Sequence, residues 1–167
     1  MILFIPFESS LDRSQFDCGR PEMDRWFREV AGQQERSGAA RTTLAVDEKD
    51  ACIAGYFTLV AYRLEPAEVL ADMGRKRRYP VPAVLIARLA VDLRYQGKGV
   101  GKIILFTALE RVAETSKALG FEMVVVDAID EDAVCFYLKH GFRRFADHSL
   151  KLFMTIKDLR ATFANPG

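Results

Sequence analysis

The stretch Gln96–Lys102 reads Gln-Gly-Lys-Gly-Val-Gly-Lys, and it separates the apolar run Ala83–Val91 from a helical pattern over Ile103–Leu119. A glycine-rich turn from a strand into a helix leaves several backbone N–H groups unpaired at the positive end of the helix dipole. Such a turn is suited to binding the oxygens of a phosphate group. The sequence therefore predicts a phosphorylated ligand at this turn.

The glycine spacing excludes two common nucleotide-binding motifs. A P-loop requires a glycine where this chain has Gln96, and a serine or threonine where it has Ile103. A dinucleotide fingerprint would place its third glycine on Lys102 or Ile104, depending on where it starts. The pattern that remains is Gln-x-x-Gly-x-Gly from Gln96 to Gly101. The alternative is a tight turn that needs glycines only for its backbone angles.

Length and composition bound the class of protein. The chain has 167 residues, of which 50% are hydrophobic, and this predicts one compact domain over residues 1–167. Its formal net charge is +1, so the chain as a whole has no strong electrostatic attraction to nucleic acid or to a membrane surface. No apolar run approaches the ~20 residues of a membrane span, and the N-terminus lacks the basic start of a signal peptide.

The cysteines and histidines predict no metal centre. There are 3 cysteines and 2 histidines, and no Cys-x-x-Cys pair is present. This usage fits a reducing compartment and gives neither a zinc site nor a disulfide framework. We expect a cytoplasmic protein that needs no metal and does not bind a membrane.

Hydrophobic periodicity predicts the elements of secondary structure. Strands are expected over residues 2–6, 42–47, 52–63, 83–91, 123–128, 143–145 and 150–155, and helices over 21–37, 103–119, 131–139 and 156–163. Their order predicts an α/β (α+β) fold, a mixed central sheet of six to seven strands with helices on both faces. The apolar stripe of the first helix is expected to be core. Its members are Met23, Trp26, Phe27, Val30 and Ala31.

A long connection over residues 64–81 joins two of the predicted strands. Pro66, Pro80 and Pro82 are expected to keep it out of regular structure. It carries a basic run of four residues, and long loops in compact domains are usually functional. The run is Arg75, Lys76, Arg77 and Arg78.

Three segments in order resemble the GNAT superfamily of acetyl-CoA-dependent acyltransferases. They are Leu89-Ala90-Val91, the Gln-x-x-Gly-x-Gly pattern, and Ala133–Phe142, which is similar to the superfamily motif Ala-x-x-Phe-Tyr-x-x-x-Gly-Phe. The resemblance implies the GNAT fold and acetyl-CoA as cosubstrate. It further implies that Tyr137 protonates the departing CoA thiolate. The residues that it implies for cofactor binding are Leu89, Ala90, Val91, Gln96, Gly97, Lys98, Gly99, Val100, Gly101, Lys102, Asp130 and Phe136.

The chemistry of Tyr137 and Asp130 can also be argued from the residues themselves. A phenol near its reference pKa of about 10 can protonate a thiolate whose conjugate acid has a pKa near 8.5, so the transfer needs no strong perturbation of either group. The alternative for Tyr137 is an aromatic ring packed on the helix face with its hydroxyl at the surface. Asp130 stands where relatives often have asparagine, and we expect it to cap the helix that starts at Glu131.

A narrower resemblance covers most of the chain. It is to the acetyltransferase toxins of bacterial type II toxin-antitoxin systems, which acetylate the α-amino group of aminoacyl-tRNA. The resemblance implies a tRNA acceptor, a homodimer, and a small ribbon-helix-helix antitoxin as partner. The segments that carry it are Phe16–Glu22 with Trp26, Ser37–Thr42, Pro82–Asp92 and Tyr95–Gly99.

The residues themselves say less about the acceptor than the resemblance does. No carboxylate or histidine stands out as a general base, which favours an α-amine, because its pKa of about 7.7 to 8.0 leaves it partly neutral at pH 7. The basic run at 75–78 and Arg41 are candidates to bind tRNA phosphates, although charge runs are often only solvated faces. Two alternatives stay open: an acetyltransferase of a small amine, peptide or protein N-terminus, and an acetyl-CoA sensor without turnover.

Overall fold

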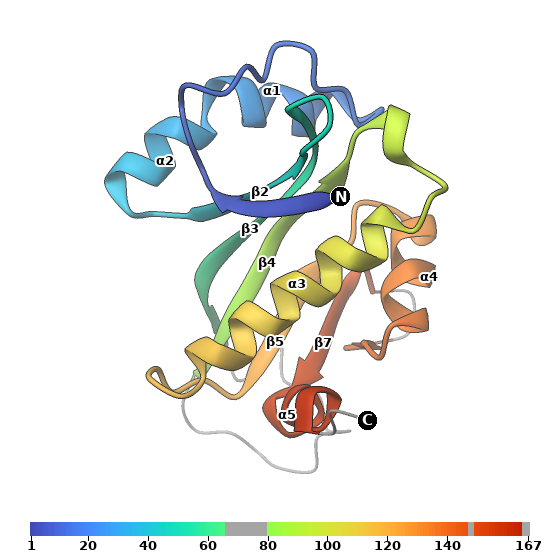
Figure 1. Cartoon of the computed structure of the whole chain (residues 1–167). Helices are drawn as coiled ribbons and strands as arrows, with labels where there is room; N and C mark the ends of the chain where they lie inside the picture. Colours follow the sequence, from blue (N-terminus) through green and yellow to red (C-terminus); the bar gives the residue numbers. More distant parts are fainter. Residues whose placement is uncertain (66–79, 147–148, 165–167) are drawn as a thin grey trace. The chain divides into compact units, whose positions relative to one another are not determined.

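The chain folds around one seven-stranded mixed sheet (Figure 1). This computed structural model describes residues 1–65, 80–146 and 149–164. The strands follow the order β1-β2-β3-β4-β5-β7-β6, in which β4 and β5 are parallel and the pairs β1–β2, β2–β3, β5–β7 and β6–β7 are antiparallel. The elements are β1 (Ile2–Pro6), α1 (Pro21–Glu29), α2 (Ala31–Ser37), β2 (Arg41–Asp47), β3 (Cys52–Leu64), β4 (Val81–Val91), the 3₁₀ turn η3 (Leu93–Tyr95), α3 (Val100–Thr115), β5 (Met123–Asp127), α4 (Glu131–Lys139), β6 (Arg143–Arg144), β7 (Lys151–Thr155) and α5 (Ile156–Ala164). The predicted mixed sheet is confirmed.

The chain divides into two compact units. The first comprises Met1–Val60 and Ala87–Ala108, and the second comprises Ala61–Ile86 and Leu109–Gly167. The strand β4 and the helix α3 each run from one unit into the other. Because these elements are continuous, we retain a single domain over residues 1–167 as a proposal.

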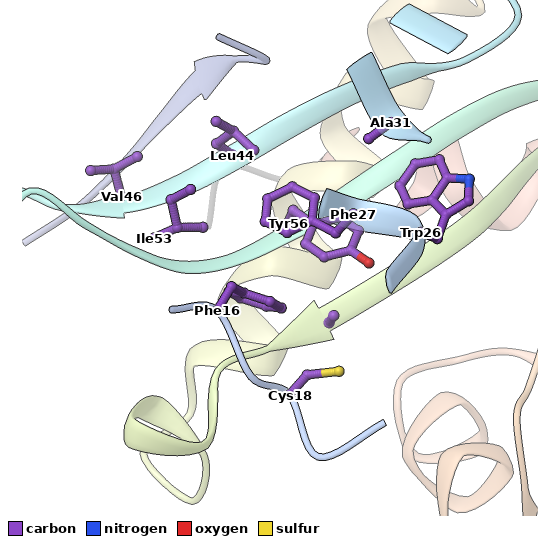
Figure 2. Packing of buried hydrophobic residues seen from close by; sticks show 10 residues of the cluster. Phe16, Cys18, Trp26, Phe27, Ala31, Leu44, Val46, Ile53 and Tyr56 are labelled. Carbon is purple, nitrogen blue, oxygen red and sulfur yellow. The ribbon is translucent and has the colours of Figure 1, made fainter. Parts of the chain in front are cut away.

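An aromatic stack forms the core of the first unit (Figure 2). The ring of Tyr56 on β3 lies 4.1 Å from that of Phe27 on α1, nearly parallel to it, and 6.1 Å from that of Trp26. Phe16 meets Phe27 edge to face at 5.0 Å. The predicted core role of the first helical stripe is therefore confirmed. The stripe packs because α1 buries both aromatic residues of its apolar face, which removes about 150–250 Å² of apolar surface from water for each ring.

The second unit has its own apolar cluster, centred on β5. Four of the five residues of β5 are buried, as expected for a strand that is covered on both faces. Phe145 and Phe153 add a tilted ring pair at 4.7 Å. The cluster consists of Leu64, Val81, Ala83, Met123, Val125, Phe145 and Phe153.

The single helix predicted over residues 21–37 is wrong, because the chain breaks at Val30. Val30 has φ −116°, outside the helical range, and it separates α1 from α2. The Arg13 guanidinium donates from Nε to the carbonyl oxygen of Phe27 at 3.0 Å and from Nη2 to that of Arg28 at 3.5 Å. Arg13 thus satisfies carbonyl groups that a continuing helix would have used, and it stabilises the helix end.

Two other elements, β4 and α3, differ from their predicted bounds by more than one residue. Pro82 lies inside β4, which begins at Val81, so this proline does not keep the chain irregular. A proline is tolerated near the start of a strand because its missing N–H is not needed there, and the carbonyl of Pro82 accepts from Glu122 N at 2.9 Å. The helix expected over residues 103–119 is α3, which spans Val100–Thr115 and thus begins within the glycine motif.

None of the helices in the described ranges is both long enough and apolar enough to cross a bilayer.

Candidate active site

The glycine motif presents an unbroken run of free backbone donors. From Gly97 to Lys102, six consecutive N–H groups have no hydrogen-bond acceptor among the residues that the structure describes. Gly97 has φ 74° and Gly99 has φ 80°, both in the left-handed region that favours glycine. A Cβ built on either glycine meets no atom within 4 Å, so the backbone angle and not crowding requires glycine there. A concave run of this kind binds anionic oxygens.

The start of α3 completes this run. Ile103 N donates to the carbonyl of Gly99 at 3.3 Å, which makes Gly99 the last residue before the helix and leaves the first helical N–H groups free. Val100 is buried, so it can face a ligand only through its main chain. The ammonium groups of Lys98 and Lys102 lie over the rings of Tyr95 and Phe106, at 6.0 and 5.9 Å.

Gln96 supports the loop and is not itself free to bind a ligand through its amide nitrogen. Its Nε2 donates to the carbonyl of Val91 at 2.8 Å and to that of Cys18 at 3.0 Å. The segment Asp17–Gly19, which we call the supporting segment, makes two further bonds to the residues between β4 and the loop. Leu93 N donates to the carbonyl of Asp17 at 2.8 Å, and Asp17 N donates to the Asp92 carboxylate at 3.1 Å.

Asp92 is the buried charge at this junction. Its side chain is almost fully inaccessible, and it accepts from Asp17 N, from Arg94 N at 2.9 Å and from Arg94 Nε at 2.9 Å. Burial alone would raise the pKa of Asp92. The hydrogen bonds from Arg94 and from the two backbone N–H groups outweigh burial and hold this pKa below its ordinary value. Asp92 is therefore ionised, and it fixes the chain between β4 and the glycine loop.

Gly55 allows β3 to approach the end of β4. A Cβ built on Gly55 would lie 2.5 Å from the carbonyl oxygen of Ala90 and 2.4 Å from Cδ1 of Ile104. Ala90 is buried in the aromatic cluster of the first unit, whereas Leu89 and Val91 are half-buried. Only glycine fits at position 55, which the sequence pattern did not single out.

Helix α4 begins as predicted. Asp130 accepts from Ala133 N at 2.9 Å through its carboxylate, and its backbone is extended, as in an N-cap. The acidic residues Glu131 and Asp132 lie in the first turn, where the helix dipole favours negative charge.

The end of α4 fixes the position of Tyr137. Phe142 N donates to the carbonyl of Tyr137 at 3.1 Å and Gly141 N donates to that of Leu138 at 3.4 Å, which is the bonding pattern of a Schellman motif. Gly141 has φ 95°. The apolar contact that usually accompanies this motif is the edge-to-face pair of Tyr137 and Phe142, with ring centroids 5.5 Å apart. The spacing Phe-Tyr-x-x-x-Gly-Phe is therefore a helix-ending signal that holds the tyrosine.

Tyr137 is buried among aromatic rings. Its second ring contact is with the half-buried Phe136 at 5.3 Å, and Phe136 also meets the His140 ring at 4.9 Å. Burial raises the pKa of Tyr137 well above its ordinary value of about 10. The phenol therefore keeps its proton throughout the neutral range and can act as a general acid there.

Comparison with known proteins adds the family. Residues 40–144 match the Acetyltransferase (GNAT) domain. This chain belongs to the GNAT acetyltransferase family. It is an acetyl-CoA-dependent acetyltransferase, and the free N–H groups of residues 97–102 fit the diphosphate of that cosubstrate.

Individual relatives of this GNAT protein are toxins. A tRNA-acetylating toxin of Mycobacterium tuberculosis is 29% identical over 150 residues, which are 90% of this chain and 89% of that protein. A crystal structure of a tyrosine-to-phenylalanine mutant of KacT has a TM-score of 0.89 at 26% identity and covers 97% of this chain and 99% of that one.

The structures of AtaT are similar in fold. AtaT complexed with acetyl-methionyl-tRNAfMet gives a TM-score of 0.86, and a tyrosine-to-phenylalanine mutant of AtaT bound to acetyl-CoA and the C-terminus of the antitoxin AtaR gives 0.83. Each is 24% identical and covers 98% of this chain and 99% of that chain. At this identity the likeness shows the GNAT fold alone.

The basic residues of this GNAT chain have different environments. The run at 75–78 lies outside the described residues. Arg41 is exposed, and its guanidinium donates to the Glu35 carbonyl at 2.8 Å and to the Glu35 carboxylate at 3.3 Å. The guanidinium carbon of Arg88 lies over the Trp26 ring, 4.4 Å from its centroid.

Within the described ranges no group of three or more histidine, cysteine or acidic side chains could hold a metal ion.

Proposed function

We propose that this acetyltransferase modifies the α-amino group of aminoacyl-tRNA and thereby acts as a translation-blocking toxin. The observation that carries the proposal is the likeness to the tRNA-acetylating toxin of Mycobacterium tuberculosis, which extends over 90% of this chain. The complex of AtaT with acetyl-methionyl-tRNAfMet supports the same acceptor class. An acetylated α-amine can no longer act as the nucleophile of peptide bond formation.

The residues of the glycine motif have the first role in this proposal. The N–H groups from Gly97 to Lys102 bind the diphosphate of acetyl-CoA, and the main chain of Leu89, Ala90 and Val91 holds its pantetheine arm. Lys98 and Lys102 add positive charge near the phosphates. Gln96 acts through the carbonyls that it bridges.

The second role belongs to α4. We assign to Tyr137 the donation of a proton to the departing sulfur of CoA, with Phe136 and Asp130 keeping the helix and its ring in place. The raised pKa of Tyr137 makes it a weaker acid than a free phenol, so the proton is transferred only as negative charge develops on the sulfur. The α-amine needs no strong base, because its ordinary pKa of about 7.7 to 8.0 lies near neutral pH.

The remaining parts of the proposal concern partners. Arg75, Lys76, Arg77, Arg78 and Arg41 bind tRNA phosphates, a ribbon-helix-helix antitoxin neutralises the enzyme, and two copies form a homodimer. The structure of AtaT with the C-terminus of AtaR supports the antitoxin. The protein acts in the cytoplasm, where charged tRNA and acetyl-CoA are both present.

One assay tests the acceptor. Purified protein is incubated with labelled acetyl-CoA and a full set of charged tRNAs, and N-acetylated aminoacyl ester is measured after nuclease digestion. We expect label on at least one charged tRNA and none on uncharged tRNA. Labelling of a free amine or a peptide N-terminus, with every charged tRNA left unmodified, would contradict the proposal and establish the small-amine or peptide acetyltransferase.

A further inference from the structure

The strand that leads into the glycine loop carries one cation on its apolar face. Arg88 and Ala90 lie two residues apart on β4, so their side chains share a face of the sheet, and Ala90 belongs to the aromatic cluster with Trp26. The guanidinium carbon of Arg88 lies over the Trp26 ring of this cluster, 4.4 Å from the ring centroid. The indole ring of Trp26 is 9% exposed and held by its neighbours, so it is a rigid support for the cation.

The guanidinium of Arg88 has no hydrogen-bond acceptor in the described part of the chain. Among the residues that the structure describes, Arg88 makes no ion pair and donates to no acceptor. The buried carboxylate of α1, Asp24, instead accepts from the backbone N–H of Cys18 at 3.0 Å. A half-buried guanidinium with five N–H donors and no acceptor is well suited to an anion from outside the protein, and its planar fork matches a phosphate.

The position of Arg88 along β4 separates this anion from the diphosphate of acetyl-CoA. Arg88 precedes Val91 by three residues, which is about 10 Å of extended strand, and the loop that binds the diphosphate begins five residues beyond Val91. In the proposed binding mode the pantetheine arm runs along the end of β4, away from the loop. Arg88 therefore lies toward the acetyl end of the cosubstrate, where the acceptor enters.

We propose that Arg88, seated on Trp26, binds the backbone phosphate next to the aminoacylated nucleotide and so positions the α-amino group for attack. This inference rests on the proposed aminoacyl-tRNA acceptor. Arg88 is a specificity-determining residue. It binds the phosphate of an acceptor whose amine is joined to a nucleotide, whereas a free amino acid ester has no phosphate to make this contact. The cation–π contact keeps the guanidinium in one orientation before the acceptor arrives.

The test uses two acceptors that differ by a single phosphate. They are hydrolysis-resistant 3′-aminoacylamido-adenosines with and without a 5′-phosphate, and kcat/KM is measured for each with saturating acetyl-CoA. The variants are Arg88→Gln, which removes the charge, and Arg88→Lys, which keeps the charge without the fork. Arg25→Gln, an exposed position on α1, is the matched control. Thermal unfolding and the KM for acetyl-CoA show whether each variant is folded and loads its cosubstrate.

The expected result is a preference of the wild type for the phosphorylated acceptor of roughly ten- to a hundredfold, as for a lost charge-assisted hydrogen bond. Arg88→Gln loses this preference, Arg88→Lys keeps part of it, and Arg25→Gln keeps all of it, while the KM for acetyl-CoA stays unchanged. A preference that persists in Arg88→Gln, or an equal loss on both acceptors, overturns the role of Arg88. If the wild type acetylates neither nucleoside nor any charged tRNA but does acetylate a free amine, the proposed function itself fails, and the role of Arg88 fails with it.

Discussion

Replacement of Gly55 by alanine tests how closely β3 must approach the end of β4. The new Cβ would lie 2.5 Å from the carbonyl oxygen of Ala90, about 0.9 Å short of an ordinary 3.4 Å contact, and 2.4 Å from Cδ1 of Ile104. The Ile104 side chain can rotate away, but the carbonyl moves only if β4 moves. Overpacking of this kind destabilises proteins by about 1–3 kcal/mol.

Two measurements follow from that displacement. At about 2–4 °C for each kcal/mol in a chain of this length, we expect the Tm of Gly55→Ala to fall by roughly 2–12 °C. A shift of about 1 Å at a substrate-holding strand can lower the rate about a hundredfold, so kcat/KM for acetyl-CoA should fall by ten- to a hundredfold. Gly120→Ala is the control, because a Cβ there meets nothing within 4 Å.

A double variant separates the two contacts. Ile104→Val removes Cδ1, and by itself it should cost about 0.5–1.5 kcal/mol. If the backbone carbonyl is the main obstacle, Gly55→Ala combined with Ile104→Val recovers less than half of the stability that Gly55→Ala loses. A Gly55→Ala protein with wild-type Tm and wild-type kcat/KM would refute the close approach of β3 to β4.

Four further predictions concern the tyrosine, the loop and the buried carboxylate. Tyr137→Phe should lower kcat by about a hundredfold or more with little change in the KM for acetyl-CoA, since general-acid catalysis contributes about 10²–10⁴-fold; an unchanged kcat excludes the acid role. Because burial raises the pKa of Tyr137, loss of its proton should cause no decline of wild-type kcat between pH 7 and 9 in a stopped assay. Gly99→Ala places a residue with a side chain at φ 80°, which costs about 1–2 kcal/mol. Titration calorimetry should therefore show acetyl-CoA binding weakened by roughly five- to thirtyfold. If Gly99→Ala and the wild type bind acetyl-CoA with equal affinity, the left-handed backbone at Gly99 is not required for binding. The folded-state pKa of Asp92 lies below its unfolded value of about 3.9, so its stabilising contribution is complete above that value and is lost as pH falls through the folded pKa. Chemical denaturation of Asp92→Asn below pH 5 should therefore show a free energy of unfolding that depends less on pH than that of the wild type. If the two proteins lose stability in parallel as pH falls, Asp92 does not supply the acid sensitivity.

Local signals in the sequence predicted several elements correctly. The bounds of α4, Glu131–Lys139, follow from the aspartate that caps its start and from Gly141 just past its end, and both act within one helical turn. The burial of β5 follows from its run of β-branched residues. The place of the glycine loop between a strand and a helix was also readable, because left-handed glycines and a helix start are local features.

Features that depend on distant contacts could not be predicted. The break at Val30 depends on Arg13, which reaches the carbonyls of residues 14 and 15 positions away. The need for Gly55 arises only when Ala90 lies beside it. Gln96 was read as part of a ligand motif, but its amide nitrogen bonds to Cys18, 78 positions earlier. The motif resemblance pointed to Tyr137, but it did not predict the depth of burial that raises its pKa.

The supporting segment Asp17–Gly19 has a consequence for how loading with acetyl-CoA can be detected. It is irregular chain that precedes α1, yet its bonds to Leu93 and Gln96 make it part of the foundation of the glycine loop. A protease can cut there only after those bonds open, and a ligand that binds the closed form makes opening rarer. Resistance of this single peptide stretch to limited digestion should therefore report whether acetyl-CoA is bound at the neighbouring glycine loop.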